Sequence, residues 1–155
     1  MNLHDIIVDT ARPAMYLDAD NKCAGFDDWD RAEASGRPYC IETRPEVIPV
    51  DIDAEHLDYL EVFRQTIAAN GDPYLEVMSG GPDSPNRHFF VHVPDEQRRN
   101  MLIAELRAIC GAKPVRVGQK IRPPFTPHRN GITVSTPVHG YTVDDFLLWV
   151  TGVMA

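Results

Sequence analysis

The sequence predicts a single α+β domain, built on a mixed or antiparallel sheet with helices packed on one face. Segments in which apolar and polar residues alternate, as they do in strands, occur between segments with the three-to-four-residue spacing of amphipathic helices. Two strand segments, 74–78 and 87–93, follow each other without a helix between them, which favours an antiparallel hairpin. A length of 155 residues fits one domain over 1–155.

Residues 1–35 are expected to form an N-terminal helical segment. Within it, Phe26, Trp29 and Ala32 recur at every third position, and a Ser-Gly pair follows. This spacing predicts a short amphipathic helix over Ala24–Glu33 that ends at the glycine.

The predicted core, residues 36–135, opens with two strands, Pro38–Ile41 and Val47–Asp53. Alternation along the second strand places three aliphatic residues on one face: Ile48, Val50 and Ile52. Pro49 has no N–H to donate, so we expect this strand to lie at a sheet edge or to be interrupted there.

A helix is predicted over Ala54–Ala69, because apolar residues recur along one stripe and a Gly-Asp-Pro sequence follows. The stripe consists of Leu57, Leu60, Phe63 and Ile67. The next residues predict a hairpin of two strands, Tyr74–Met78 and Arg87–Val93, around the loop Ser79–Asn86.

The rest of the chain predicts a helix over Pro94–Cys110 and a closing helix in the segment 136–155. Short strands are expected between them, at Val115–Val117, Lys120–Arg122 and Ile132–Ser135. The closing helix covers Val143–Val153, with Thr142 as its N-cap.

Charge is distributed unevenly along the chain. The formal net charge of -8 argues against a surface that binds nucleic acid over its whole extent. Residues 1–70 hold fifteen acids and six Lys and Arg, whereas residues 71–155 hold eight acids and nine Lys and Arg. The stretch 111–143 contains no acid but five cations, so it can hold an anion, or it can be a solvated basic loop.

The sequence carries no sign of a membrane span or of secretion. No apolar run approaches the roughly 20 residues that a membrane helix needs, and the first ten residues include two Asp where a signal peptide is basic and then apolar. The three cysteines include no CxxC pair, which indicates neither a disulfide framework nor a zinc ribbon. We expect a cytoplasmic protein without a membrane partner.

Two carboxylates end the strand Val47–Asp53. Asp51 and Asp53 lie on the same face of this strand, about 7 Å apart from the rise of two residues. Such a pair can hold Mg²⁺ or Mn²⁺, and the metal ion would draw together the negative groups of a nucleotide. The alternative is that Asp53 caps the following helix and Asp51 is an ordinary exposed strand residue.

The returning strand of the hairpin carries the next candidate. Alternation separates two sets of residues: His88, Phe90 and His92 on one face, and Phe89, Val91 and Val93 on the other. If the second set is core, His88 points to the face with the acids, where it can contact a phosphate or an incoming nucleotide. Arg87, at the start of the strand, can add a second contact.

A proline-rich stretch, 118–131, is the third candidate. Three prolines around Phe125 stiffen it, so that Arg122, His128 and Arg129 are held at low entropic cost. This arrangement suits a phosphate-rich ligand, and the alternative is a rigid surface loop.

Taken in order, three motifs resemble one known family. They are Val50-Asp51-Ile52-Asp53, then Ser79-Gly80-Gly81 leading to Arg87-His88-Phe89-Phe90-Val91, then the stretch from Ile121 to Gly131. This order resembles the archaeo-eukaryotic primase superfamily, and more closely the primase-polymerase domains of phages, plasmids and other mobile elements. The likeness spans residues 36–135 and would place the protein in a bacterial or phage-infected cell.

The resemblance implies an RRM-like catalytic core for metal-dependent nucleotidyl transfer in DNA replication. Asp51 and Asp53 would bind Mg or Mn, and His88 would contact the phosphates of the incoming nucleotide. Contacts to nucleotide or DNA are expected from Ser79, Arg87, Arg116, Lys120, Arg122, His128 and Arg129. The implied partners are nucleoside triphosphates, a single-stranded DNA template, and a helicase or other replication protein.

One position departs from the family pattern. The third motif of the family supplies another metal-binding acid just before the Pro-Pro segment, whereas residues 113–116 contain none. Replacement acids are available at four positions: Glu76, Asp83, Asp144 and Asp145. Three other functions stay open: a non-catalytic nucleic-acid-binding module on the same fold, a metal-dependent nuclease or phosphodiesterase, and an acidic protein-interaction domain.

Overall fold

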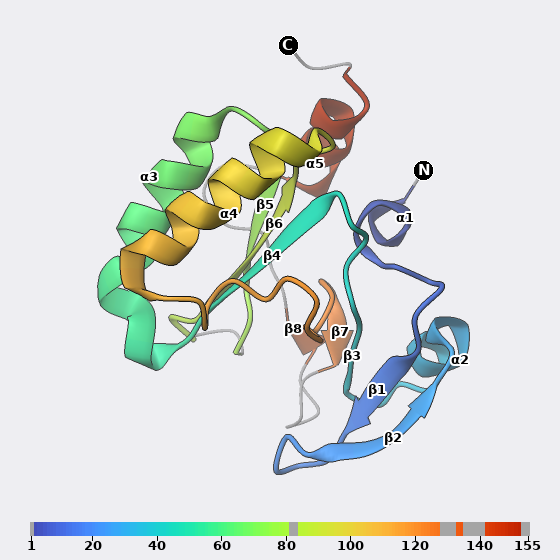
Figure 1. Ribbon diagram of the computed structural model, residues 1–155. Helices are drawn as coiled ribbons and strands as arrows, with labels where there is room; N and C mark the ends of the chain where they lie inside the picture. The colour runs from blue at the N-terminus through green and yellow to red at the C-terminus, as the bar shows by residue number, and fades with distance from the viewer. Residues whose placement is uncertain (1, 81–83, 128–132, 135–141, 153–155) are drawn as a thin grey trace.

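The computed structural model describes residues 2–80, 84–127, 133–134 and 142–152. These residues form two three-stranded antiparallel sheets, a two-stranded ribbon and five α-helices (Figure 1). The predicted α+β class with antiparallel strands is confirmed. Among the described residues, no helix is long and apolar enough to cross a membrane.

The central sheet has the strand order β4-β6-β5, with β4 at Val47–Ile52, β5 at Tyr74–Met78 and β6 at Arg87–His92. Both pairings are antiparallel, so the predicted hairpin is confirmed. The register places His88 between Asp51 on one side and Val77 on the other.

The edge position predicted from Pro49 is also confirmed, because β4 ends the order of this sheet. The outer side of β4 bonds to a later segment of backbone: the Arg116 N–H donates to the Pro49 carbonyl at 2.9 Å, and the Asp51 N–H donates to the Pro114 carbonyl at 2.7 Å. The missing N–H of Pro49 therefore faces the edge of the sheet and costs β4 no bond to β6.

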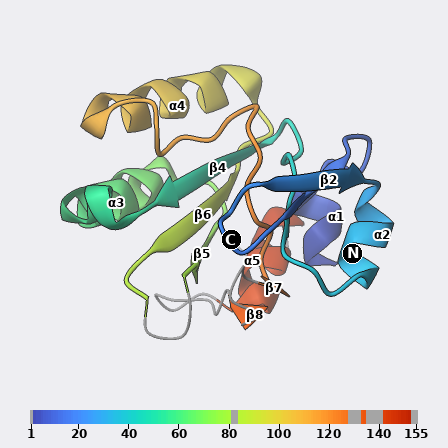
Figure 2. The same cartoon turned by 90° about the horizontal axis from the view of Figure 1, so that it is seen from below.

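Helices α3 and α4 cover one face of the central sheet, which we call the helix face (Figure 2). The predicted helix 54–69 is present as a 3₁₀ helix, η1 at Ala54–Tyr59, followed by α3 at Leu60–Asn70. Helix α4 covers Glu96–Cys110. The side chains that meet the sheet are fully or almost fully buried: Phe63, Ile67, Leu102 and Leu106. Each such side chain contributes about 1.5–3 kcal/mol through burial.

Helices also cover the opposite face of the sheet, so the expectation of helices on one face is wrong. Leu75, Val77 and Phe90 are apolar on that side, and they pack in one cluster with α1 at Leu3–Ile7 and α5 at Val143–Val150. Thr142 is the N-cap of α5, as predicted. Central strands with apolar residues on both faces need cover on both.

A second sheet, of order β2-β1-β3, stands beside the first. Its strands are β1 at Ala14–Leu17, β2 at Cys23–Asp27 and β3 at Tyr39–Cys40. Residues 1–35, expected to be helical, thus contain a hairpin between α1 and α2, which covers Trp29–Ala34.

The predicted helix Ala24–Glu33 is wrong over its first half. Gly25 has φ 125°, and Phe26 is 61% exposed on strand β2. The helix begins after Asp28, whose carboxylate accepts the Arg31 N–H at 3.0 Å. The N-cap chemistry of Asp28 therefore outweighs the apolar spacing that suggested an earlier start.

Residues 114–121, here called the bridging segment, join the two sheets. Val115 pairs with Val50 on β4, and Ile121 pairs with Ile41 next to β3. The Ile41 and Ile121 backbones exchange two hydrogen bonds of 2.8 Å. The strands predicted at 115–117 and 120–122 are thus single bridges, whereas the strand predicted at 132–135 contains β8, Thr133–Val134, which pairs with β7, Thr126–Pro127.

Candidate functional site

The site starts at the end of β4, where two acids and a histidine meet. Asp51 and His88 are register partners, and His88 Nε2 lies 3.3 Å from Asp51 Oδ1. His88 is 5% exposed, and its neighbours Phe89 and Val91 are core residues of the helix face. The prediction that His88 faces the acids is confirmed.

Asp53 occupies the N-cap position of η1 but makes no capping hydrogen bond through its side chain. The alternative in which Asp53 serves as a helix cap is therefore not realised. Its carboxylate belongs instead to the group around Asp51, because each of the two acids acts on the pKa of the other.

The two acids differ in proton affinity. Burial and the neighbouring charge of Asp51 raise the pKa of Asp53. Burial also acts to raise the pKa of Asp51, but the contact with His88 and the positive charge of Arg116 outweigh it and lower the pKa. Acids whose proton affinities are pushed apart in this way are typical of sites that bind a cation or move a proton.

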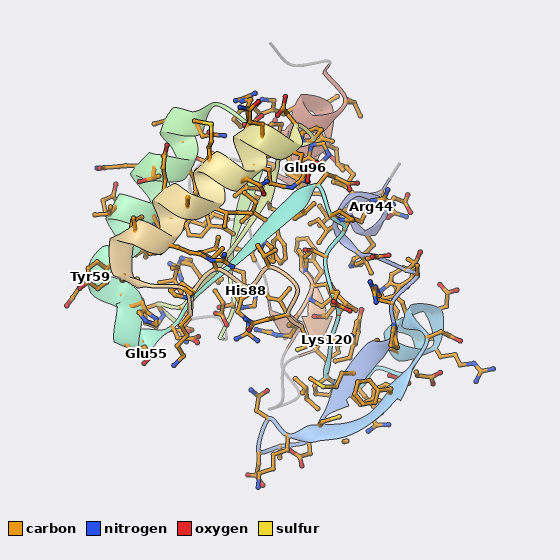
Figure 3. The ribbon with its side chains drawn as sticks, viewed as in Figure 1. Arg44, Glu55, Tyr59, His88, Glu96 and Lys120 are labelled. Atoms are coloured by element: carbon orange, nitrogen blue, oxygen red, sulfur yellow. The ribbon has the colours of Figure 1, made fainter. Side chains whose placement is uncertain are left out.

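These residues open into a cavity of about 430 Å³ between the central sheet and the β2-β1-β3 sheet. Seven of the predicted site residues line it: Asp51, Asp53, Ser79, His88, Arg116, Lys120 and Arg122. Figure 3 labels two of them, His88 and Lys120, which come from β6 and from the bridging segment. Residues from separate motifs thus meet in one place.

The cations of this cavity are held by backbone carbonyls. Arg116 Nη2 donates to the Lys120 carbonyl at 2.9 Å. Lys120 Nζ donates to the Pro13 carbonyl at 2.6 Å and lies 3.5 Å from a carboxylate oxygen of Glu42. Arg122, which is 9% exposed, donates to the Ser79 carbonyl. Three ordered cations therefore stand in the same cavity as two acids.

Several buried polar atoms that line the cavity have no hydrogen-bond partner among the described residues. They are Asp51 Oδ1, Asn86 Oδ1, His88 Nδ1 and Arg116 Nε. Most buried polar groups in folded proteins are hydrogen-bonded, and exceptions need a reason. The residues that line the cavity therefore keep donors and acceptors to which a polar ligand could bond.

Asp51 and Asp53 are the residues of this cavity that could hold a divalent cation such as Mg²⁺ or Mn²⁺. Mg²⁺ is usually held by one or two carboxylates, and the phosphates of the substrate and water complete its shell. Asp51 and Asp53 supply such a pair. Across the described ranges, no group of three or more His, Cys, Asp and Glu is arranged to hold a metal ion by itself.

Glu76 does not supply a third carboxylate to this cavity. It is a register partner of Phe89, so it lies on the helix face, and it is fully buried. Its two oxygens accept from Arg64 Nε and Nη2, both at 2.8 Å. Asp145 is also engaged, because it forms a capping box with Thr142. Asp83 lies outside the described residues.

Arg87 does not line the cavity. Its side chain belongs to the helix face, where Arg87 Nε lies 3.5 Å from Glu76 Oε2. The reason is the alternation that turns His88 toward the acids, since it turns Arg87 away from them. His128 and Arg129, the remaining predicted contacts, lie outside the described residues.

Sequence reasoning missed part of the cavity wall, which comes from Leu17, Asn21, Cys40 and Asn86. The first two belong to the β1–β2 hairpin, which was not predicted. Asn21 has φ 63°, a conformation that Asn adopts more readily than most residues in a turn. Burial raises the pKa of the Cys40 thiol to about 11, so this thiol is protonated near neutral pH.

Comparison of the chain with protein-family models, with curated proteins and with solved structures found no match. The cavity itself brings two acids and three cations together: Asp51, Asp53, Arg116, Lys120 and Arg122.

Proposed function

We propose that this chain is a primase-polymerase-like domain, which binds a nucleoside triphosphate and a single-stranded DNA template and carries out metal-dependent nucleotidyl transfer. The observation that carries the proposal is that residues of separate motifs line one cavity of about 430 Å³: Asp51, Asp53, His88, Arg116, Lys120 and Arg122. Each motif is weak alone, and their convergence in space supports a shared ligand.

The proposed reaction joins a 3′-hydroxyl oxygen to the α-phosphorus of a nucleoside triphosphate. The bond from that phosphorus to the oxygen of the leaving pyrophosphate breaks, and the hydroxyl proton passes to solvent. Asp51 and Asp53 would hold a divalent metal ion, which neutralises phosphate charge and lowers the pKa of the attacking hydroxyl. Arg116, Lys120 and His88 would stabilise the charge on the phosphates.

We also propose that the central sheet with α3 and α4 is an RRM-like core. Its elements follow the order strand, helix, strand, strand, helix, and the bridge at Val115 then supplies a short fourth pairing. That bridge lies on the outer edge of β4, antiparallel to it, which gives the order fourth-first-third-second. With the single bridge counted as a fourth strand, this order is that of the β-α-β-β-α-β fold, which supports the proposal.

The test is nucleotide incorporation on a primed single-stranded DNA template with Mn²⁺ or Mg²⁺. We expect incorporation by the wild-type chain and a loss on the order of a hundredfold or more in the double variant Asp51→Asn with Asp53→Asn, because the metal ion loses both charged ligands. Asp58→Asn, an exposed acid in η1, is the matched control and should keep full activity. Equal incorporation by the double variant and the control would overturn the proposal.

A non-catalytic nucleic-acid-binding module is the second candidate. It is favoured by the absence of a third carboxylate from the described part of the cavity, since Glu76 lies on the opposite face of the sheet. Such a module would bind single-stranded DNA with an affinity that falls steeply with salt and survives the Asp51→Asn change. Salt-dependent binding without incorporation by any variant would select this candidate.

A further inference from the structure

A buried charge network lies behind the cavity, on the helix face of the central sheet. Glu76 on β5 is fully buried and accepts two hydrogen bonds of 2.8 Å from the Arg64 guanidinium on α3. Arg87 Nε lies 3.5 Å from the same carboxylate. The side chains of Arg64 and Arg87 are only 15% and 18% exposed, so this network is shielded from water.

The network continues into the loop between β5 and β6. Arg87 Nη1 donates to two backbone carbonyls of this loop, that of Ser84 at 2.8 Å and that of Asn86 at 2.9 Å. The Asn86 carbonyl also accepts the Ser79 N–H at 3.2 Å, which closes the base of the loop. We call this base, formed by Ser79, Gly80 and Asn86, the loop neck. A chain of contacts thus runs from helix α3 through Glu76 and Arg87 to the loop neck.

The loop neck is held from both faces of the sheet. Arg122 donates to the Ser79 carbonyl from the cavity side, and Arg87 donates to the Asn86 carbonyl from the helix face. The neck is also closely packed, because a Cβ placed on Gly80 would lie 2.2 Å from Ser84 Oγ. This close contact between Gly80 and Ser84 limits the movement of the neck backbone once the Arg87 side chain is held in place.

The same neck forms one wall of the cavity through Ser79, Gly80 and Asn86, and His88 follows directly on β6. Asn86 Oδ1 and His88 Nδ1 are two of the buried atoms without a hydrogen-bond partner among the described residues. Asn86 belongs to the neck to which Arg87 bonds, and His88 follows two residues later on β6, whereas Asp51 lies on β4 and Asp53 directly follows that strand.

We propose that Arg64, Glu76 and Arg87 are positioning residues that fix the loop neck so that Asn86 and His88 meet a nucleoside triphosphate in the cavity. The inference rests on the proposed function for the identity of that ligand. Arginine suits the role because its planar fork donates several hydrogen bonds in a fixed geometry. None of the three residues touches the cavity, so they act through the loop.

The test uses Arg87→Met, which keeps an unbranched apolar stem but removes every donor. Glu76 retains both hydrogen bonds from Arg64 in this variant, so the fold is expected to persist. The matched control is Arg98→Met, which removes an arginine that pairs with Asp72 at 2.9 Å and bonds the Asn70 carbonyl at 3.1 Å, beyond the set of residues that line the cavity. Arg87→Lys restores one donor group.

Three quantities are measured for each protein: the affinity for dATP with Mn²⁺, the affinity for Mn²⁺ alone, and the hydrogen exchange of the Ser79 amide. For Arg87→Met we expect on the order of tenfold weaker dATP binding and on the order of tenfold faster exchange of Ser79, since charge-assisted hydrogen bonds are lost. The Mn²⁺ affinity should stay within about twofold, because Asp51 lies on β4 and Asp53 directly follows it, and the Arg87 side chain bonds to neither. Arg87→Lys should recover part of the loss, and Arg98→Met should match wild type.

Two results would overturn the inference. One is wild-type exchange of Ser79 in Arg87→Met, which would show that the neck does not depend on Arg87. The other is an equal fall in the affinities for dATP and Mn²⁺, which would indicate general destabilisation. If the wild-type chain binds Mn²⁺ but no dATP, the proposed function fails, and the Ser79 exchange still decides whether Arg87 holds the neck.

Discussion

The two faces of the central sheet hold their carboxylates in opposite ways. On the helix face, the Glu76 carboxylate uses both oxygens in hydrogen bonds to Arg64. On the cavity face, Asp51 Oδ1 lies 3.3 Å from His88 Nε2 without the geometry of a hydrogen bond. The Glu76 carboxylate is thus satisfied within the chain, whereas the Asp51 carboxylate keeps an oxygen that can accept from a ligand.

The contrast comes from the alternation of side chains along β5 and β6. Arg87 and His88 are adjacent in sequence, yet one joins the ion-pair network and the other joins the cavity. Every second residue therefore belongs to a different chemical environment. Variants at neighbouring positions should accordingly change different properties, either stability or ligand binding.

The largest effect is expected from Glu76→Gln, which breaks the helix-face network. The change removes the charge that Arg64 and Arg87 share, so Arg87 loses its carboxylate partner and Arg64 keeps only the exposed Glu61. We expect the free energy of unfolding to fall by about 3–5 kcal/mol, the usual cost of removing one member of a buried ion pair. Urea denaturation at pH 7.5 measures it.

Glu61→Gln is the control for that experiment. Glu61 also pairs with Arg64, but its side chain is 63% exposed, so its loss should cost no more than about 1 kcal/mol. Similar losses for Glu61→Gln and Glu76→Gln would remove the distinction between the two faces.

A smaller effect is expected from Thr142→Ala, which tests how helix α5 is stabilised against the central sheet. The Thr142 hydroxyl accepts the Asp145 N–H at 3.0 Å and begins α5, whose Phe146 is fully buried in the cluster on that face. Losing this cap should lower the free energy of unfolding by about 1 kcal/mol. Thr151→Ala, at the exposed end of α5, should cost less than about 0.5 kcal/mol. Equal costs for the two variants would argue against the cap.

The smallest effect, and one of opposite sign, is expected from Asp53→Asn. The pKa of Asp53 is raised by burial and by Asp51, so its charged form is less favourable in the folded chain than in the unfolded chain. The contribution of Asp53 to the stability of the wild-type protein therefore falls as the pH rises above 3.8, the ordinary value of its pKa, and is regained as the pH falls. The variant carries no such charge, so its melting temperature should exceed that of wild type at pH 7.5.

This difference in melting temperature should shrink as the pH is lowered toward 4, because a growing fraction of the Asp53 carboxyls is then protonated in folded wild type. Thermal scans of both proteins, taken about every half pH unit between pH 4 and pH 8, measure this difference. A variant less stable than wild type at neutral pH would mean that the Asp53 charge is satisfied within the chain, as the Glu76 charge is.

Elements whose apolar residues follow a single clear period could be predicted from the sequence. The alternation in β4 and β6 placed Asp51 and His88 on one face, and the spacing of Phe63 and Ile67 located α3. The same alternation also excludes Arg87 from the cavity, although the motif resemblance had suggested it as a contact. In that case geometry was more informative than motif order.

Other features depended on contacts that no local pattern records. Arg64, the partner of Glu76, lies twelve residues away on α3. Leu17, which lines the cavity, belongs to a hairpin whose strands show little alternation of apolar and polar residues. Phe26 fits a helical spacing but lies on β2, because Asp28 begins the helix two residues later. Short segments with competing signals are decided by capping and tertiary contacts.

The bridging segment has one more consequence, for how such a cavity can change over evolutionary time. Its first residues are bonded to the edge of β4 and its last residue to Ile41, and a turn at Gly118, with φ 73°, lies between. Arg116 and Lys120, on either side of that turn, line the cavity between the two sheets. Insertions or deletions in the turn are therefore expected to reshape the wall of the cavity, because the hydrogen bonds at Val50 and at Ile41 lie outside it.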